Sequence, residues 1–154
     1  MKGKLILSGL LVCLAAAAVC FAADAFTGTW KLNEGKSKMP PGVTKNTTVT
    51  YEQVGDSVKV TLDGIGADGK PTHDEWTGKY DGKDYPVTGN PNNDTRSYKK
   101  INDRTLEVTG KKGDKVVLKA KVIISPDGKT RTVAATQTGA DGKKETSIAV
   151  YDRQ

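Results

Sequence analysis

Hydrophobic and polar residues alternate along almost the whole chain after Phe26, and the first such segment is Thr29-Trp30-Lys31-Leu32. Because side chains of a β-strand point alternately to its two faces, this period of two predicts strands with one buried face. No segment shows a convincing helical period. The predicted strands cover residues 27–33, 46–54, 57–64, 72–80, 84–87, 95–101, 105–110, 115–125, 130–138 and 143–151.

Short turns separate the predicted strands. The tripeptide Asp-Gly-Lys recurs at Asp68, Asp81, Asp127 and Asp141. A glycine after an aspartate supplies the positive φ of a tight hairpin, so these repeats predict turns between adjacent antiparallel strands. A calcium loop is the alternative, but it needs several oxygen ligands at alternate positions closed by an acid. No repeat has this pattern, so we interpret the repeats as turns.

A series of hairpins with roughly eight to ten strands forms a meander, and such a meander avoids exposed edges by closing into a barrel. We therefore predict an all-β fold, an antiparallel up-and-down meander β-barrel. The chain shows no linker and no second hydrophobic unit. The segment 26–154 therefore has the length and the uniformity of a single domain.

The first 25 residues differ from the rest. Lys2 and Lys4 precede an apolar run over residues 5–18, and small residues follow. This order is typical of a secretory signal peptide. Cleavage after Ala22 and cleavage after Ala25 both fit, and the sequence does not choose between them. We expect a periplasmic or secreted protein, with no membrane anchor after cleavage.

Two alternatives exist for this segment. A membrane span needs about 20 apolar residues, but here small residues follow the apolar run and no basic stop comes after it. A lipid anchor at Cys20 is disfavoured because Val19 stands where Gly, Ala or Ser is needed. Both cysteines, Cys13 and Cys20, lie in the predicted signal. The mature chain therefore has no thiol chemistry and no cysteine-ligated metal.

The net charge of +6 comes from lysines and arginines scattered singly or in pairs among acidic residues. Nucleic-acid binding requires such charges on one face, with aromatic residues among them. The pattern instead indicates a well-solvated surface. We expect no nucleic-acid partner and a monomeric protein.

The opening Phe26-Thr27-Gly28-Thr29-Trp30-Lys31-Leu32-Asn33 resembles the Gly-x-Trp signature of the lipocalin and fatty-acid-binding-protein superfamily. The mature chain is similar to secreted bacterial lipocalin-like proteins, also in the segment 80–89 and in Ala149-Val150-Tyr151. The resemblance implies structural roles for Gly28 and Trp30, with the tryptophan closing one end of the barrel. It also implies an arginine packed over Trp30, and both Arg131 and Arg153 are candidates.

The chain departs from fatty-acid-binding proteins at two places. Their helical lid would fall within residues 34–45, where Pro40-Pro41 forbids a helix through the middle. We therefore expect a barrel without a helical lid. Their Arg-x-Tyr pair, which holds a ligand carboxylate, is incomplete here, because Tyr151 is present but Ala149 replaces the arginine.

No set of residues indicates catalysis. His73 is the only histidine and shares a strand face with Glu75 alone, which we interpret as a surface position. The segment 89–94 has enough oxygen atoms for a weak cation site, but its Gly, Pro and Asn residues are equally typical of a turn. We expect no enzymatic activity, no cofactor and no metal.

The predicted function is reversible binding of a small hydrophobic ligand in the barrel interior. At about eight strands a barrel is just wide enough to be either hollow or filled. In a hollow barrel we expect the ligand among inward-facing residues: Tyr51, Leu62, Trp76, Tyr98, Leu118 and Val133. The alternative is a non-catalytic structural or protein-interaction module of the cell envelope with a filled core.

Overall fold

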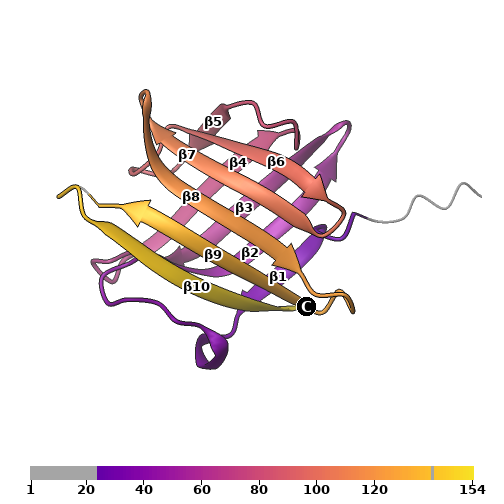
Figure 1. The fold of residues 1–154 in the computed structure, drawn as a ribbon, viewed down its shortest axis with the longest axis horizontal. Coiled ribbons are helices and arrows are strands. Elements are labelled where there is room, and N and C mark those ends of the chain that lie inside the picture. Colours follow the sequence, from indigo (N-terminus) through magenta and orange to yellow (C-terminus); the bar gives the residue numbers. More distant parts are fainter. Residues whose placement is uncertain (1–23, 140) are drawn as a thin grey trace, which may run out of the picture.

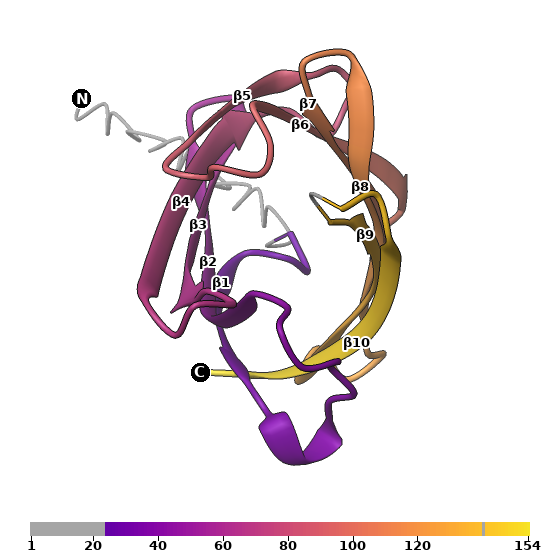
Figure 2. The ribbon, with the colours of Figure 1, turned by 90° about the vertical axis from the view of Figure 1, so that its left-hand side faces the viewer.

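Ten strands build the part of the chain that this computed structural model describes, residues 24–139 and 141–154. Each strand runs antiparallel to the next, and the first pairs with the last, so the sheet closes into a barrel (Figure 1, Figure 2). The predicted meander barrel is confirmed. The strands are β1 (Gly28–Leu32), β2 (Lys45–Val54), β3 (Ser57–Ile65), β4 (Pro71–Gly78), β5 (Tyr85–Thr88), β6 (Thr95–Asn102), β7 (Thr105–Lys112), β8 (Lys115–Ile124), β9 (Thr130–Thr138) and β10 (Lys144–Arg153).

The predicted signal segment lies almost entirely outside the described residues, since residues 1–23 are not among them. Its cleavage therefore stays a prediction. Within the described residues, no helix is both long enough and apolar enough to cross a bilayer.

The four Asp-Gly-Lys repeats occupy turns, and their carboxylates have a local role. In each repeat the aspartate Oδ1 accepts a hydrogen bond from the backbone N–H of the lysine two residues later, at 3.0 to 3.1 Å. An aspartate side chain that bonds its own backbone in this way stabilises a turn.

The connection between β1 and β2 contains one turn of 3-10 helix, η1 (Glu34–Lys36). The Asn33 side chain caps it by accepting a hydrogen bond from the backbone N–H of Lys36 at 3.2 Å. The rest of the connection, which includes Pro40-Pro41, is not helical. The expected barrel without a helical lid is what the structure has.

One end of the barrel, called the Trp30 end below, is closed by packed side chains. Trp30 and Phe26 are fully buried, and the Trp30 Nε1–H donates to the backbone oxygen of Phe26 at 2.9 Å. The Arg153 guanidinium lies over the Trp30 ring, 4.2 Å from its centroid. Of the two candidate arginines, Arg153 is the one that covers the tryptophan, and Arg131 lies elsewhere.

Arg153 also ties three chain segments together at this end. Its guanidinium donates to the backbone oxygens of Ala25, Thr27 and Gly128 at 2.6 to 2.7 Å. Gly28 makes room for it, because a Cβ at that position would lie 3.0 Å from Nη1 of Arg153. The φ of Gly28 is +120°, which residues other than glycine rarely adopt, so the backbone conformation and the nearby Arg153 both favour glycine in the Gly-x-Trp motif.

The interior is packed less completely toward the opposite end. On β8, β9 and β10, the inward-facing side chains nearest the Trp30 end are buried: Val122, Ile124, Arg131, Ala149 and Tyr151. Further from that end, inward-facing side chains of the same three strands are only half-buried: Leu118, Ala120, Val133, Ala135, Gln137 and Ser147. The barrel interior is therefore accessible to solvent from the end opposite Trp30.

Candidate functional site

Two arginine side chains lie inside the barrel, Arg96 on β6 and Arg131 on β9. They are 3% and 5% exposed, respectively. Alternation places Arg96 on the same strand face as Tyr98, and Arg131 on the same face as Val133, so the strand period itself turns both side chains inward. A buried charge is strongly unfavourable unless it is paired and hydrogen-bonded. The two arginines differ in how this requirement is met.

Arg96 has an acidic partner. Its Nη1 donates to Oδ1 of Asp74 at 3.1 Å, and its Nη2 lies 3.5 Å from Oδ1 of Asn93. Asp74 also accepts from Nδ2 of Asn90 at 2.6 Å. The backbone oxygen of Arg96 accepts from Nε1 of Trp76 at 2.7 Å. This network is a compensated ion pair that attaches the segment 89–94 to the barrel wall.

The same network accounts for the oxygen atoms that made the segment 89–94 a candidate cation site. Oδ1 of Asn90 accepts from the backbone N–H of Asn92 at 2.9 Å. The Asp94 carboxylate accepts from Nζ of Lys112 at 2.7 Å and from the backbone N–H of Gly113 at 2.9 Å. These oxygens therefore stabilise a turn and its attachment to the β7–β8 hairpin.

Arg131 has no acidic partner among the described residues. Its Nη2 donates to the Tyr51 hydroxyl at 3.0 Å across the barrel interior. The guanidinium lies 5.5 Å from the Tyr51 ring centroid and 4.7 Å from that of Tyr151. Within the described structure, Nε and Nη1 are buried and make no hydrogen bond. Arg131 is thus a buried cation held only by neutral aromatic side chains.

Further tyrosines extend this cluster toward the Trp30 end. The Tyr80 ring lies 6.1 Å from that of Tyr98 and packs edge-on against Phe26. The buried Tyr80 hydroxyl has no hydrogen-bond partner among the described residues. Burial raises the pKa of Tyr80, Tyr98 and Tyr151. Their hydroxyls therefore stay protonated near neutral pH.

These groups define the candidate site, which we call the Arg131 cluster: Arg131, Tyr51, Tyr80, Tyr98 and Tyr151. It combines an uncompensated positive charge with hydroxyl donors in a low-dielectric interior. Such an arrangement is suited to holding an anionic or strongly polar group.

The six residues predicted to bind a ligand all belong to the interior, but at different depths. Tyr51, Trp76 and Tyr98 are buried, and the ring centroids of Trp76 and Tyr98 lie 4.4 Å apart, with the two ring planes inclined by 49°. Leu62 is buried farther along β3, where it pairs with Asp74. The structure thus brings Trp76 and Tyr98 together, and Tyr51 joins them through the Arg131 cluster.

Leu118 and Val133 are the two half-buried members of the predicted set. Val133 lies two residues after Arg131 and pairs with Val122 and Ala149. Leu118 pairs with Gln137, farther from the Trp30 end. These two residues line the accessible part of the interior, and Val133 also packs against the buried core.

Sequence reasoning missed the interior arginines as site residues. The available signal was the alternation of the strands, because Arg96 lies on the same strand face as Tyr98, and Arg131 on the same face as Val133. Because both side chains are charged, the sequence alone favoured positions on the outer surface of the barrel. Only contacts between distant strands show that Arg96 pairs with Asp74, whereas Arg131 has no acidic partner in the part of the chain that the structure describes.

His73 lies on the outer surface. Its Nδ1 is 2.6 Å from Oδ1 of Asp63, and its Nε2 is 3.6 Å from Oε1 of Glu75. The hydrogen bond to Asp63 raises the pKa of His73. In the described residues no group of three or more His, Cys, Asp or Glu side chains is placed to hold a metal ion.

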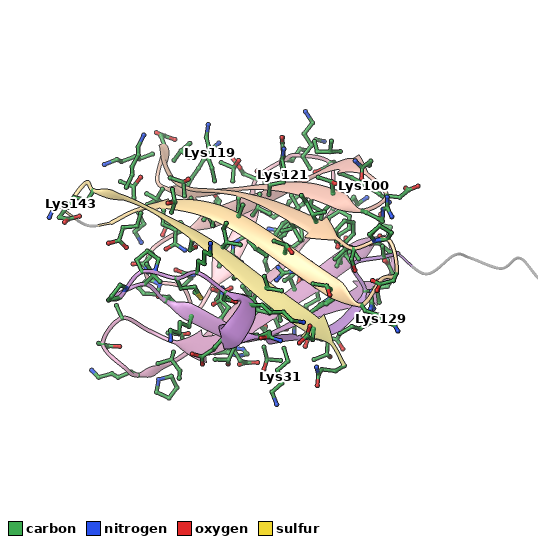
Figure 3. The ribbon with its side chains drawn as sticks, turned by 60° about the horizontal axis from the view of Figure 1, so that its bottom comes forward. Lys31, Lys100, Lys119, Lys121, Lys129 and Lys143 are labelled. Carbon is green, nitrogen blue, oxygen red and sulfur yellow. The ribbon has the colours of Figure 1, made fainter. Side chains whose placement is uncertain are left out.

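The described residues form two concave regions, and neither is lined by a residue of the Arg131 cluster. One of about 100 Å³ adjoins η1. The other, of about 350 Å³, lies over β7, β8 and β9 and is flanked by Lys119 and Lys121, which point away from the barrel (Figure 3). The inward-facing side chains near Trp30 are buried, so a ligand inside the barrel would lie in the half-buried region beyond them.

Comparison with known proteins identifies no family. No protein-family model matches the chain, and no curated protein is similar to it in sequence. Among solved structures it is similar to a redesigned β-barrel, mFAP1, bound to DFHBI, with 14% identity, a TM-score of 0.45 and coverage of 86% of this chain and 98% of that one. It is also similar to EF1p2_mFAP2b bound to DFHBI, with 13% identity, a TM-score of 0.47 and coverage of 86% and 97%. These likenesses are too distant to bear on function.

Proposed function

We propose that this chain is an exported, lipocalin-like, non-catalytic protein that reversibly binds a small hydrophobic molecule inside its barrel. One observation carries the proposal. On β8, β9 and β10, inward-facing apolar side chains, among them Leu118 and Val133, are only half-buried although they line the interior. Apolar surface inside a closed barrel that remains accessible to solvent is surface that a ligand would cover.

The free energy for such binding comes from the apolar area that the ligand and the wall remove from water, about 25 cal/mol per Å². Ligand pockets are usually apolar, with a few polar groups that set the orientation of the ligand. Leu118, Ala120 and Val133 supply the apolar wall, and the Arg131 cluster supplies the polar groups. Because the Trp30 end is packed, the ligand would enter from the opposite end.

Export is proposed from the first 25 residues, whose order of charged, apolar and small residues is that of a signal peptide. We assign the mature protein to the periplasm or the exterior as a monomer of one domain.

A second function is favoured by a different observation. Tyr51, Trp76 and Tyr98 are buried and packed near the Trp30 end. A barrel filled in this way suits a structural or interaction module that contacts another envelope protein through its surface.

Replacing Leu118 with tryptophan distinguishes the two functions. In a carrier, the larger ring occupies the accessible part of the interior, so binding of a neutral apolar fluorescent probe should be lost while the fold is kept. In a filled barrel, the ring overpacks the core and lowers the free energy of unfolding by about 1–3 kcal/mol. Probe fluorescence and urea denaturation measure the two quantities.

The matched control is Ile123→Trp, which places the same ring on β8 at an exposed position. This variant should bind the probe like the wild type. A wild-type protein that does not bind the probe, together with a strongly destabilised Leu118→Trp variant, would leave the interaction module as the function.

A further inference from the structure

We propose that the outer surface of β8, β9 and β10 binds reversibly to an anionic lipid bilayer. The inference goes beyond the proposed function and does not depend on it, because a hollow and a filled barrel have the same outer surface. The surface consists of the outward-pointing residues of the segments 119–123, 132–136 and 146–150, and we call it the β8–β10 face. Alternation assigns these residues to the outside, since Ala120, Val122 and Ala149 point inward.

The pairing of the strands makes this face continuous. Lys121 pairs with Ala134, and Ala134 pairs with Ile148 on the next strand. Lys119 and Ile123 lie on either side of Lys121 along β8. Ile123 and Ile148 are each 44% exposed and belong to the few large hydrophobic residues that the described structure leaves on its surface. Two lysines and two isoleucines therefore share one surface.

The β8–β10 face is positively charged. Its outward-pointing positions are Lys, Ile, Thr, Ala and Val, with no acidic residue among them. Glu107 of β7 pairs with Lys121 in the ladder, yet neither Lys119 nor Lys121 forms an ion pair in the part of the chain that the structure describes. Lys59 on β3, by contrast, lies 2.8 Å from Glu75. Figure 3 shows Lys119 and Lys121 pointing away from the barrel, so both charges are open to a partner.

The face is also hollowed. Lys119, Lys121 and Ala134 line the concave region of about 350 Å³ described above, in which Glu107 is the one acid. Two ammonium groups at such a hollow complement a phosphate head group, and the long apolar stems of the lysines let their charged ends reach it. Ile123 lies beside the hollow, where it would meet the boundary between head groups and acyl chains.

The composition of the face favours a bilayer over an acidic protein. Protein interfaces are rich in Trp, Tyr and Arg and poor in Lys, whereas this face has lysines and no aromatic residue or arginine. Lysines beside aliphatic residues are typical of surfaces that lie in the membrane interface, where anionic lipids attract them. With only two lysines and two isoleucines, the binding is weak and reversible, which agrees with the expected absence of a membrane anchor.

The test measures co-sedimentation of the protein without residues 1–22, which keeps all ten strands, with lipid vesicles. One preparation contains phosphatidylcholine alone, and the other contains phosphatidylcholine with about one-third phosphatidylglycerol. The protein should bind only the second preparation in about 0.1 M salt and should be released in about 1 M salt, where the Debye length falls from about 10 Å to about 3 Å.

The double substitution Lys119→Gln/Lys121→Gln should lower the partition coefficient for the anionic vesicles roughly thirtyfold, because each lysine near such a surface contributes roughly a factor of five. The matched control is Lys59→Gln/Lys79→Gln. It removes the same charge from lysines that are paired with Glu75 and Asp56 outside the β8–β10 face. This control should bind like the parent protein.

A tryptophan at the face tests contact with the lipid directly. In Ile123→Trp, the added fluorescence should shift to shorter wavelength with anionic vesicles, because the ring enters a less polar environment. Val54→Trp places the same ring at an exposed position on β2, outside the face, and should show no shift.

Four results would overturn the proposal: no binding to the anionic vesicles, equal binding to both vesicle preparations, a Lys119→Gln/Lys121→Gln variant that binds like the parent, and binding to polyglutamate without binding to vesicles. The last result would assign the face to an acidic protein. None of them bears on the proposed function, because binding of the apolar probe concerns the barrel interior.

Discussion

Arg131 and Arg96 show, at the scale of single residues, how one side chain type takes two roles in the same interior. Arg96 is compensated by Asp74 and attaches a loop, so its role is structural. Arg131 lacks such an acid among the described residues, and its free donors face the interior. The difference depends entirely on which side chains the neighbouring strands bring near each guanidinium.

Trp30 is the residue on which the closed end depends. It is fully buried and is covered by Arg153. Trp30→Ala should lower the free energy of unfolding by about 3–5 kcal/mol, as removal of other buried large aromatic side chains does. Urea denaturation of the purified protein measures the change.

A matched control is Val54→Ala, since Val54 is among the exposed large hydrophobic residues. It should change stability by less than about 0.5 kcal/mol. A Trp30→Ala variant as stable as this control would show that the closed end does not depend on the tryptophan.

At the scale of elements, β5 is the weakest part of the barrel wall. It pairs through two residues with β4 and through two with β6. The segment after it compensates, because Asn90 donates to Asp74 and Asp94 accepts from Lys112 and Gly113. The sequence predicted this strand from a short alternating segment, but its support comes from side chains of β4 and the β7–β8 hairpin.

A substitution of Gly89, which directly follows β5, tests whether the position of β5 depends on its contacts with β4. The φ of Gly89 is +82°, and a Cβ there would lie 2.3 Å from the backbone oxygen of His73, which cannot move without shifting β4. Gly89→Ala should therefore destabilise the protein by more than the roughly 1 kcal/mol that an incompatible φ alone costs. Thermal unfolding and amide hydrogen exchange of β4 and β5 measure the effect.

Gly42→Ala is the control, because Gly42 has the same φ of +82° with nothing within 4 Å of the added Cβ. The difference between the two variants isolates the collision with β4 from the strain of the backbone. Equal destabilisation by both would show that β5 adjusts freely and that its position is not constrained.

At the scale of the whole molecule, pairing of β1 with β10 leaves the sheet without an edge. Closure removes the row of unpaired backbone groups through which sheets associate. It also brings the segment before β1 against Arg153 from the last strand, so the chain just after the predicted signal is part of the closed end.

This placement bears on processing. The backbone oxygen of Ala25 accepts from Nη2 of Arg153 at 2.6 Å, and that of Asp24 accepts from the backbone N–H of Thr27 at 3.0 Å. Cleavage after Ala25 would remove both acceptors, whereas cleavage after Ala22 keeps them. We therefore expect a mature protein that begins at Ala23.

N-terminal sequencing and the intact mass of protein isolated from its own cell envelope check this expectation. A mature chain that begins at Phe26 would mean that the closed end does not need these contacts. An intact Met1 or a diacylated Cys20 would contradict the predicted signal peptide itself.

The sequence alone is enough to predict the strands, the turns and the meander, because these depend on near neighbours. Alternation assigns each side chain to a face, and an aspartate followed by glycine forms a turn with its own backbone. The predicted strands therefore agree with the observed ones to within a few residues at each end. It also placed Tyr51, Trp76 and Tyr98 on inward faces.

Three features depend on the folded barrel and could not be predicted: which arginine covers Trp30, which charged residues lie inside, and which of those charges is compensated. Arg153 reaches Trp30 because β1 pairs with β10, and Arg96 meets Asp74 from a strand two places away in the barrel. Electrostatic compensation depends on distances between residues far apart in the chain, and alternation carries no information about those distances. That Arg131 has no acidic partner among the described residues is therefore a property of the closed barrel.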